Sequence, residues 1–412
     1  MALESVRQAL RLLWAHKLRS ILTLFGIVWG TASVIFLVGW GEGSQAMLER
    51  GFFKAGKNMG EVWAGKVSEE FTPAVDRRFL WFTLDDVKAL RQRARVPEVI
   101  GAESWEMLPA VNGARAITVD VRGLDPEAIE IRGVGVAAGR QLSRPDLEHR
   151  RRVVVLGEKI RARLLGPEGR IGSWIRIAGK PFRVIGFLEP VGTQLSRDRM
   201  EIDEQVWVPI TTLHANWPRW WTDDFVVTKI LYRMPDRQMM EESEREVRAI
   251  LADRIGVGSD DEEAVGIWSS LKMLNQLPLD QTTGLLFILA ATTLLIGGIG
   301  VLNMMLDAVH ERRQEIGVRL AVGARRRDVV LQFFVETLTI CLIGGVLGAL
   351  LGVGACLWLG SLDFPDLVPV PTLRPGIVVT ALGVLAGVGV TAGVIPAWRA
   401  SRVDPAVMLR EE

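Results

Sequence analysis

The strongest constraint in the sequence is a set of four long runs without Asp, Glu, Lys or Arg. They cover residues 20–41, 281–306, 337–362 and 375–398. Each is long enough for the roughly 20 apolar residues with which a helix crosses the hydrocarbon core of a bilayer. A buried helix of a soluble protein can mimic one such run, but rarely four. We therefore predict four transmembrane helices. The first run exceeds the roughly 7–15 apolar residues of a signal peptide, which favours an uncleaved anchor.

Basic residues near the four runs predict their orientation. They are Arg7, Arg11, Lys17 and Arg19 before the first run, Arg312, Arg313, Arg319, Arg325, Arg326 and Arg327 between the second and third, and Arg399, Arg402 and Arg410 after the fourth. The connection between the third and fourth runs has only Arg374. Because Lys and Arg in short loops stay on the cytoplasmic side, both termini and the Arg-rich loop are predicted to be cytoplasmic, and residues 42–280 to lie outside.

Residues 42–280 have the pattern of a mixed soluble domain. Strands are predicted at residues 116–121, 153–156, 174–177, 182–188, 205–210 and 225–232, and helices at residues 87–95 and 236–255. Residues 83–86 fit a helix-starting cap, and residues 42–59 and 267–283 are candidates for a helical stalk. The predicted fold is an α-helical membrane protein with four transmembrane helices and a large α+β extracytoplasmic domain inserted between helices 1 and 2.

These patterns divide the chain into nine segments. They are a cytoplasmic amphipathic helix (1–19), transmembrane helix 1 (20–41), the extracytoplasmic α+β domain with helical stalk ends (42–280), transmembrane helix 2 (281–306), a cytoplasmic loop (307–336), transmembrane helix 3 (337–362), a short external loop (363–374), transmembrane helix 4 (375–398) and a cytoplasmic tail (399–412).

Composition and motifs exclude most chemistry on this chain. The formal charge of +1 argues against a nucleic-acid binder, and the only two cysteines lie in the third run. Residues 51–58 resemble a phosphate-binding loop, but Asn58 replaces the hydroxyl residue that holds Mg²⁺. Residues 133–138 are interpreted as a loop, and residues 310–314 lack the second histidine of a zinc protease. We therefore expect no catalytic residue, cofactor or metal on this chain, and no intramembrane charge for ion coupling.

Glycines four residues apart predict close helix packing. Such pairs or triplets occur in the first, third and fourth runs: Gly26, Gly30, Gly344, Gly348, Gly352, Gly383 and Gly387. Small residues at this spacing let helices approach closely in lipid. Glycine is also common in spanning helices without any such role, so this alternative stays open. Four helices form a small bundle, which makes self-association plausible.

The cytoplasmic loop is short and amphipathic. Ile316, Leu320 and Ala324 share one stripe, while Glu311, Arg312, Glu315 and Arg319 line a polar face, and Gly323 is predicted to end the helix. A short helix tied to two spanning helices can transmit a push from a soluble partner. The alternative is an interfacial helix that only rests on lipid headgroups.

A tryptophan cluster in the outer domain has two interpretations. Trp217, Trp220 and Trp221 follow one another closely in residues 216–221. Exposed aromatic residues contact partners or lipid, whereas an ordinary loop packs its aromatic rings on its own domain. The sequence leaves the role of this cluster open.

The cytoplasmic loop resembles the coupling loop of MacB/FtsX-type ABC transporter permeases. The resemblance rests on residues 311–324, on 9–27 and 41–43, on 153–158, 171–177 and 182–186, and on 396–410. These pieces match the family's coupling loop, entry helix and first span, periplasmic core domain and C-terminal tail. Each piece alone is modest, but their order and spacing together are specific.

The resemblance implies a non-catalytic permease in the bacterial inner membrane. It would pair with itself or a similar permease, and with a cytoplasmic ATPase on a separate chain that binds ATP and Mg²⁺. ATP hydrolysis there would move the periplasmic domain to export or extract a drug, peptide or lipoprotein, together with a periplasmic adaptor where one takes part. Carried over by position, the coupling residues are Glu311, Arg312, Glu315, Gly317, Arg319, Gly323 and Ala324. The alternatives are a signalling or scaffold protein of the FtsX type that regulates a periplasmic partner and, with least support, a membrane-anchored enzyme.

Overall fold

The computed structural model describes residues 17–401, except 55, 69–78, 168, 199, 220–223 and 367. The chain divides into two compact units. One combines Met1–Met47 with Pro278–Glu412, and the other is Leu48–Leu277. Most of the predicted N-terminal helix and the cytoplasmic tail lie outside the described residues.

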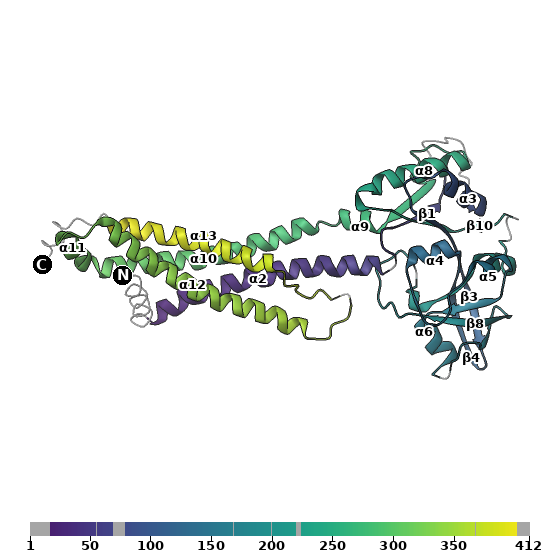
Figure 1. The fold of residues 1–412 in the computed structure, drawn as a ribbon, viewed down its shortest axis with the longest axis horizontal. Coiled ribbons are helices and arrows are strands. Elements are labelled where there is room, and N and C mark those ends of the chain that lie inside the picture. Colours follow the sequence, from purple (N-terminus) through teal and green to yellow (C-terminus); the bar gives the residue numbers. More distant parts are fainter. Residues whose placement is uncertain are drawn as a thin grey trace. The chain divides into compact units, whose positions relative to one another are not determined.

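The first unit is helical. Its described elements are α2 (Lys17–Phe53), α10 (Leu279–Glu311), α11 (Arg313–Ala321), α12 (Arg326–Gly360) and α13 (Pro375–Ser401). Four of them, α2, α10, α12 and α13, contain stretches long and apolar enough to cross a membrane. Figure 1 shows these four helices side by side, with α11 following α10. The prediction of four transmembrane helices is confirmed.

The spanning helices share one apolar core. Ile27 of α2, Leu294 of α10, Ile340 of α12 and Leu385 of α13 all lie in this core, and α12 and α10 both pack along α13. Many large apolar side chains instead point away from it, among them Leu350, which is 66% exposed. An apolar surface of this kind suits a lipid environment, in which the helices satisfy their own backbone polar groups.

The second unit is an α+β domain built on one large mixed sheet. The strands are β1 (Met59–Ala64), β3 (Val99–Asn112), β4 (Arg115–Leu124), β5 (Val136–Gly139), β6 (Val153–Leu156), β7 (Trp174–Ile177), β8 (Lys180–Leu188), β9 (Gln205–Pro209), β11 (Lys229–Arg233) and β12 (Val265–Ser269). Their order is β12-β1-β11-β3-β4-β9-β6-β8-β5, and β7 pairs with β3 and β8. Two short strands, β2 (Phe82–Thr83) and β10 (Val226–Val227), form a second sheet.

Helices and three apolar cores complete this domain (Figure 1). The helices are α3 (Leu84–Arg93), α4 (Pro126–Arg132), α5 (Arg144–Glu148), α6 (Glu158–Ile160), α7 (Ile210–Asn216), α8 (Met240–Ile255) and α9 (Ser270–Gln276), with three shorter 3-10 or π segments, η1 (Arg161–Leu165), η2 (Ile202–Glu204) and η3 (Arg237–Met239). One core lies under α3 and α8, a second under α6 and α7, and a third under α4. The prediction of a large α+β domain between helices 1 and 2 is confirmed.

Local signals in the sequence had different outcomes. Thr83 and Asp86 form the predicted capping box at the start of α3, in which each side chain bonds the other's backbone. Ala178 and Gly179, both with positive φ, form the turn of the hairpin between β7 and β8, at the two predicted strands 174–177 and 182–188. Residues 133–138, interpreted as a loop, contain the start of β5 instead.

The stalk prediction is partly wrong. The first flank does continue as a helix, because α2 runs without interruption to Phe53. The second flank is not one helix: it contains β12, the short α9 and the first turn of α10, with a break at Leu277 and Pro278. Proline has no backbone N–H to donate to the preceding turn, which explains a helix boundary at this position.

Candidate functional site

The helix α11 lies in the connection between α10 and α12, where the coupling residues were predicted. It runs from Arg313 to Ala321, with Val322 as its C-cap residue. Gly323 follows with φ +101, a conformation that side chains other than glycine rarely adopt. The prediction that Gly323 ends this helix agrees with that geometry.

One face of α11 is buried in the apolar core of the spanning helices. Ile316 is only 5% exposed and joins the core of the spanning helices together with Val329 and Phe333, while Gly317 is also buried. Ala324 does not continue this stripe as predicted: it is exposed, because the helix ends at Ala321 and the helical spacing stops there.

Polar side chains tie α11 to the first turns of α12. Arg312 Nη1 lies 3.4 Å from Oε1 of the fully buried Glu336, and Gln332 Nε2 donates to the same oxygen at 3.4 Å. Arg319 Nη1 donates to Gln332 Oε1 at 3.0 Å and its other terminal nitrogen pairs with Glu315. These contacts connect α11 and the residue before it to α12.

The opposite face of α11 is exposed and partly apolar. Val318 is 51% exposed and Val322 is 84% exposed, one helical turn apart. Glu315 and Arg319 lie beside them, and Glu311 is exposed at the end of α10. Sequence reasoning missed both valines, although their spacing from the Ile316–Leu320 stripe places them on the other side of a helix.

Five of the seven predicted packing glycines lie at helix contacts. A Cβ atom built on Gly26 or Gly30 would lie 3.0 or 2.7 Å from the α10 backbone. Built on Gly344, Gly348 or Gly352, it would lie within about 3 Å of residues of α2, with Val28 O only 2.6 Å from the one on Gly348. The close approach of α2 to α10 and α12 therefore requires glycine.

The remaining two glycines do not have the predicted contact within the chain. A Cβ atom on Gly383 or Gly387 would meet nothing within 4 Å among the described residues. On α13 the glycines that face α12 are Gly389 and Gly393, which lie against Cys341 and Thr337. The four-residue spacing is the same on both faces of α13, so the sequence pattern does not distinguish them.

Of the tryptophan cluster, only Trp217 lies within the described residues. Its ring stacks on Phe182 with centroids 5.7 Å apart, and it packs partly against one of the domain's apolar cores. Trp220 and Trp221 lie outside the described residues.

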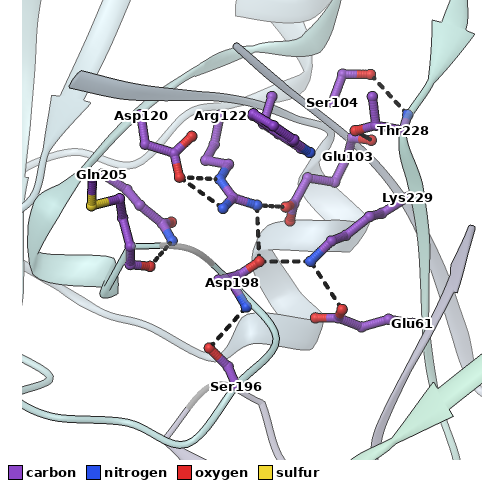
Figure 2. A network of polar contacts seen from close by, with 12 residues as sticks. Glu61, Glu103, Ser104, Asp120, Arg122, Ser196, Asp198, Gln205, Thr228 and Lys229 are labelled. Atoms are coloured by element: carbon purple, nitrogen blue, oxygen red, sulfur yellow. Dashed lines mark hydrogen bonds and ion pairs between the residues drawn. The ribbon is translucent and has the colours of Figure 1, made fainter. Parts of the chain in front are cut away.

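A second polar site, not found from the sequence, lies inside the outer domain. It is a buried charge cluster of four carboxylates and three cations: Glu61, Glu103, Asp120, Asp198, Arg122, Arg132 and Lys229 (Figure 2 labels all but Arg132). All the carboxylate side chains are at most 1% exposed, and the most exposed cation, Lys229, is 14% exposed. They come from β1, β3, β4, β11, the end of α4 and the loop between β8 and η2.

Asp198 connects the cations of the cluster. Its Oδ1 lies 3.0 Å from Arg122 Nη1 and 2.6 Å from Lys229 Nζ, and its Oδ2 lies 3.0 Å from Arg132 Nη1. Both arginines also pair with Glu103, at 2.5 and 2.6 Å. The cluster therefore holds the loop that carries Asp198 against the sheet.

Burial and neighbouring charges set the protonation of the cluster. Burial raises the pKa of Asp198 by itself, but the charges of Arg132 and Arg122 outweigh this and place the pKa well below its ordinary value. Burial raises the pKa of Glu61, and Lys229 opposes this only in part. Burial likewise raises the pKa of Asp120. The two carboxyls that are hardest to ionise thus lie at the two ends of the cluster.

The sequence does contain a signal for this cluster. In β1, Glu61 and Trp63 alternate with the buried Val62, and Glu103 and Trp105 show the same spacing in β3. Alternate residues of a strand lie on one face, so an acidic residue and an indole two apart mark a polar face. The sequence does not predict that β11 pairs with both β1 and β3. This pairing sets Lys229 opposite Glu103.

The chain combines four candidate spanning helices, an α+β domain between the first two and a short amphipathic helix between the second and third, which is the architecture of a membrane permease. The family model of the MacB-like periplasmic core domain matches residues 20–250, and that of the FtsX-like permease C-terminal domain matches residues 287–405. The chain belongs to the MacB/FtsX-type ABC transporter permeases.

Individual relatives agree with this family. The chain is 28% identical to the uncharacterized ABC transporter permease YknZ of Bacillus subtilis, over 100% of this chain and 99% of that protein. It is 31% identical to the macrolide export ATP-binding/permease protein MacB of Chromobacterium violaceum and 32% identical to the pyoverdine export ATP-binding/permease protein PvdT of Pseudomonas fluorescens. It covers 61% and 60% of those two longer proteins.

Two solved structures are similar to the outer domain. The extracellular domain of YknZ matches with a TM-score of 0.42 and 18% identity, covering 51% of this chain and 100% of that one. The periplasmic region of MacB from Actinobacillus actinomycetemcomitans matches with a TM-score of 0.43 and 16% identity, covering 54% of this chain and 94% of that one.

Proposed function

We propose that this chain is a non-catalytic permease subunit that converts ATP hydrolysis on a separate ATPase subunit into movement of its extracytoplasmic domain. The supporting observation is the construction of α11. Ile316 and the Arg312–Glu336 contact fix it to the spanning helices, while Val318 and Val322 leave an apolar face exposed to a partner. A helix fixed on one side and open on the other passes a push from a soluble protein to α12.

The proposed setting is the bacterial inner membrane, with both termini and α11 in the cytoplasm and the α+β domain outside. Two copies, or one copy and a similar permease, form the working unit with two ATPase subunits and, where present, a periplasmic adaptor. Export or extraction of a drug, peptide or lipoprotein is the proposed task. The names of the MacB and PvdT relatives, which state macrolide and pyoverdine export, support transport over regulation of a periplasmic enzyme.

The test exchanges the charges of the exposed ion pair on α11. Glu315→Arg and Arg319→Glu each break the pair, whereas the double variant E315R/R319E restores it with reversed polarity. Gln332, which accepts from Arg319, can donate to a glutamate instead. An exposed pair within one helix contributes at most about 0.5 kcal/mol, so all three variants are expected to fold.

The measurement is ATP hydrolysis by the co-purified ATPase in the presence of each variant. If the partner recognises these charges, both single variants and the exchanged pair lose at least about 1.4 kcal/mol of coupling, a tenfold loss of stimulation. If the exchanged pair stimulates the ATPase fully while the single variants do not, the ion pair stabilises α11 and the partner does not recognise its charges. Full stimulation by all three contradicts the proposed contact.

A further inference from the structure

A cleft of about 210 Å³ opens beside the buried charge cluster of the outer domain. Its walls carry both indole rings of the two strand motifs and part of the cluster: Glu61, Trp63, Trp105, Arg122, Arg197, Asp198, Thr228 and Lys229. Figure 2 shows the side chains of Glu61, Asp120, Arg122, Asp198 and Lys229 turned toward one another in the cluster. The proposed transport function does not use this cleft.

The cleft already holds a cation on an aromatic face. The guanidinium carbon of Arg197 lies 3.9 Å from the centroid of the Trp63 ring, and that of Arg122 lies 6.0 Å from the centroid of Trp105. Arg122 is locked in ion pairs, but Arg197 is exposed and no ion pair of it is found among the described residues. An exposed cation–π contact contributes only about 0.5–1 kcal/mol, so Arg197 is easily displaced.

The acidic side of the cleft has an unused hydrogen-bond acceptor. Glu61 is fully buried; its Oε2 accepts from Lys229 at 2.9 Å, but its Oε1 has no hydrogen-bond partner among the described residues. A buried carboxylate oxygen without a donor is costly, because it has lost its hydration without replacement. The four carboxylates of the cluster face three buried cations, and Arg197 on Trp63 is a further cation in the cleft, so a cationic ligand that displaces Arg197 takes over its charge.

We propose that this cleft binds a guanidinium or primary alkylammonium group, which donates to Glu61 Oε1 and takes the place of Arg197 on Trp63. The aromatic face attracts the charge, the carboxylate accepts its hydrogen bond, and the volume limits the occupant to a small molecule or to the end of a longer one. This inference involves only the outer domain, and it holds or fails independently of the coupling to an ATPase.

The test titrates the full-length chain in detergent micelles with butylguanidinium, followed by saturation-transfer NMR of the ligand. Its neutral isostere butylurea and empty micelles serve as blanks. Glu61→Gln keeps the shape of the side chain and removes its charge, so binding weakens by at least about tenfold. Arg197→Ala removes the competing cation, so binding strengthens by roughly two- to fivefold.

A matched variant distinguishes the cleft from any other arginine–aromatic contact. Arg161 lies over Phe187 at 5.5 Å in the same domain, outside the cleft, so Arg161→Ala leaves the affinity unchanged. Weaker binding by E61Q together with tighter binding by R197A supports the proposal, and the gain in R197A tests it by itself if E61Q folds poorly. Equal binding of butylurea, or R197A binding no tighter than the wild-type chain, overturns it.

A second arm of the titration distinguishes the sources of such a cation. A capped Gly-Arg-Gly tripeptide presents the same guanidinium on a peptide backbone. If it competes with butylguanidinium, a basic side chain of a peptide or protein fits the cleft; if only butylguanidinium binds, the cleft is restricted to small amines and guanidines.

Discussion

Arg132 illustrates how a single residue of the outer domain stabilises its surroundings. Its guanidinium is fully buried and pairs with Glu103 at 2.6 Å and Asp198 at 3.0 Å. Replacing it by methionine leaves two carboxylates without this partner in a site that excludes water. We expect Arg132→Met to lower the free energy of unfolding by about 3–5 kcal/mol, measured by thermal unfolding of the outer domain.

The double variant R132M/E103Q is the control, because it also removes the charge of Glu103, one of the two carboxylates that lose their partner in R132M. It is expected to recover part of the loss, which gives a favourable coupling energy between the two residues. Strictly additive effects of R132M and E103Q contradict the idea that their pairing is what makes the buried charges tolerable.

The carboxyl group of Asp146 makes the stability of the outer domain depend on pH. Burial raises the pKa of its carboxyl, but hydrogen bonds from Arg140 and Ser143 outweigh this and lower the pKa from 3.8 to about 2. The folded state therefore binds fewer protons than the unfolded state between these values. The stabilisation by Asp146 is present above about pH 4 and is lost as the pH falls toward 2.

The variant Asp146→Ala isolates this contribution. At pH 7 it is expected to be less stable than the wild-type chain by about 1–2 kcal/mol, because it loses the cap of α5 as well as the ion pair. The difference between the two chains should shrink from pH 7 to pH 3, as followed by their unfolding midpoints. A difference that stays constant over this range argues against the ionised carboxylate as its cause.

At the scale of elements, α2 and α12 approach so closely that a methyl group does not fit between them. A Cβ atom on Gly348 would lie 2.6 Å from Val28 O and 2.7 Å from Thr31 Cβ. Gly348→Ala is therefore expected to destabilise the helical unit by about 1–3 kcal/mol, measured by thermal unfolding of the chain in detergent. Gly383→Ala, on an open face of α13, is the matched control and should change stability by less than about 0.5 kcal/mol. Equal effects of the two variants contradict the packing described for α12.

The elements differed in how far the sequence could predict them. The spanning helices were found because lipid excludes charge from long runs, a rule that needs no tertiary context. Strand β3 was missed, since Glu103, Ser104 and Glu106 interrupt the apolar pattern that marks a strand. Glu103 is tolerated there because β4 brings Arg122 to it, whereas Ser104 and Glu106 lie on the other face, where Ser104 donates to Val226 O and Glu106 pairs with Arg219. No local sequence pattern predicts the register between strands that are far apart in the chain.

The position of α11 could be predicted from the sequence, but the exposure of its apolar surface residues could not. Its position, its glycine end and the buried Ile316 follow from helical spacing in residues 311–324. The internal pairing of Glu315 with Arg319 also follows from a four-residue spacing. The exposure of Val318 and Val322 became visible only when the packing of α11 on α12 had fixed which face is covered.

At the scale of the whole molecule, the proposed function places ATP hydrolysis on a separate chain and the movement of the outer domain on this one. Among the described residues no group of three or more His, Cys, Asp or Glu side chains is placed to hold a metal ion. Within the described residues, the glycines of α12 pack closely on α2 in one helix bundle. Under the proposed function, the permease acts as a mechanical link between the ATPase and the outer domain.

The most direct test measures movement of the outer domain while the ATPase works. Cys341 and Cys356, both buried in α12, are replaced by alanine, and a spin label is attached to Arg176→Cys, an exposed position on β7. Distances between labels on the two copies of the chain are then compared without nucleotide and with ATP trapped on the co-purified ATPase. The account predicts that the distance distribution shifts with ATP and that Glu315→Arg abolishes the shift. Steady ATP turnover with an unchanged distribution contradicts it.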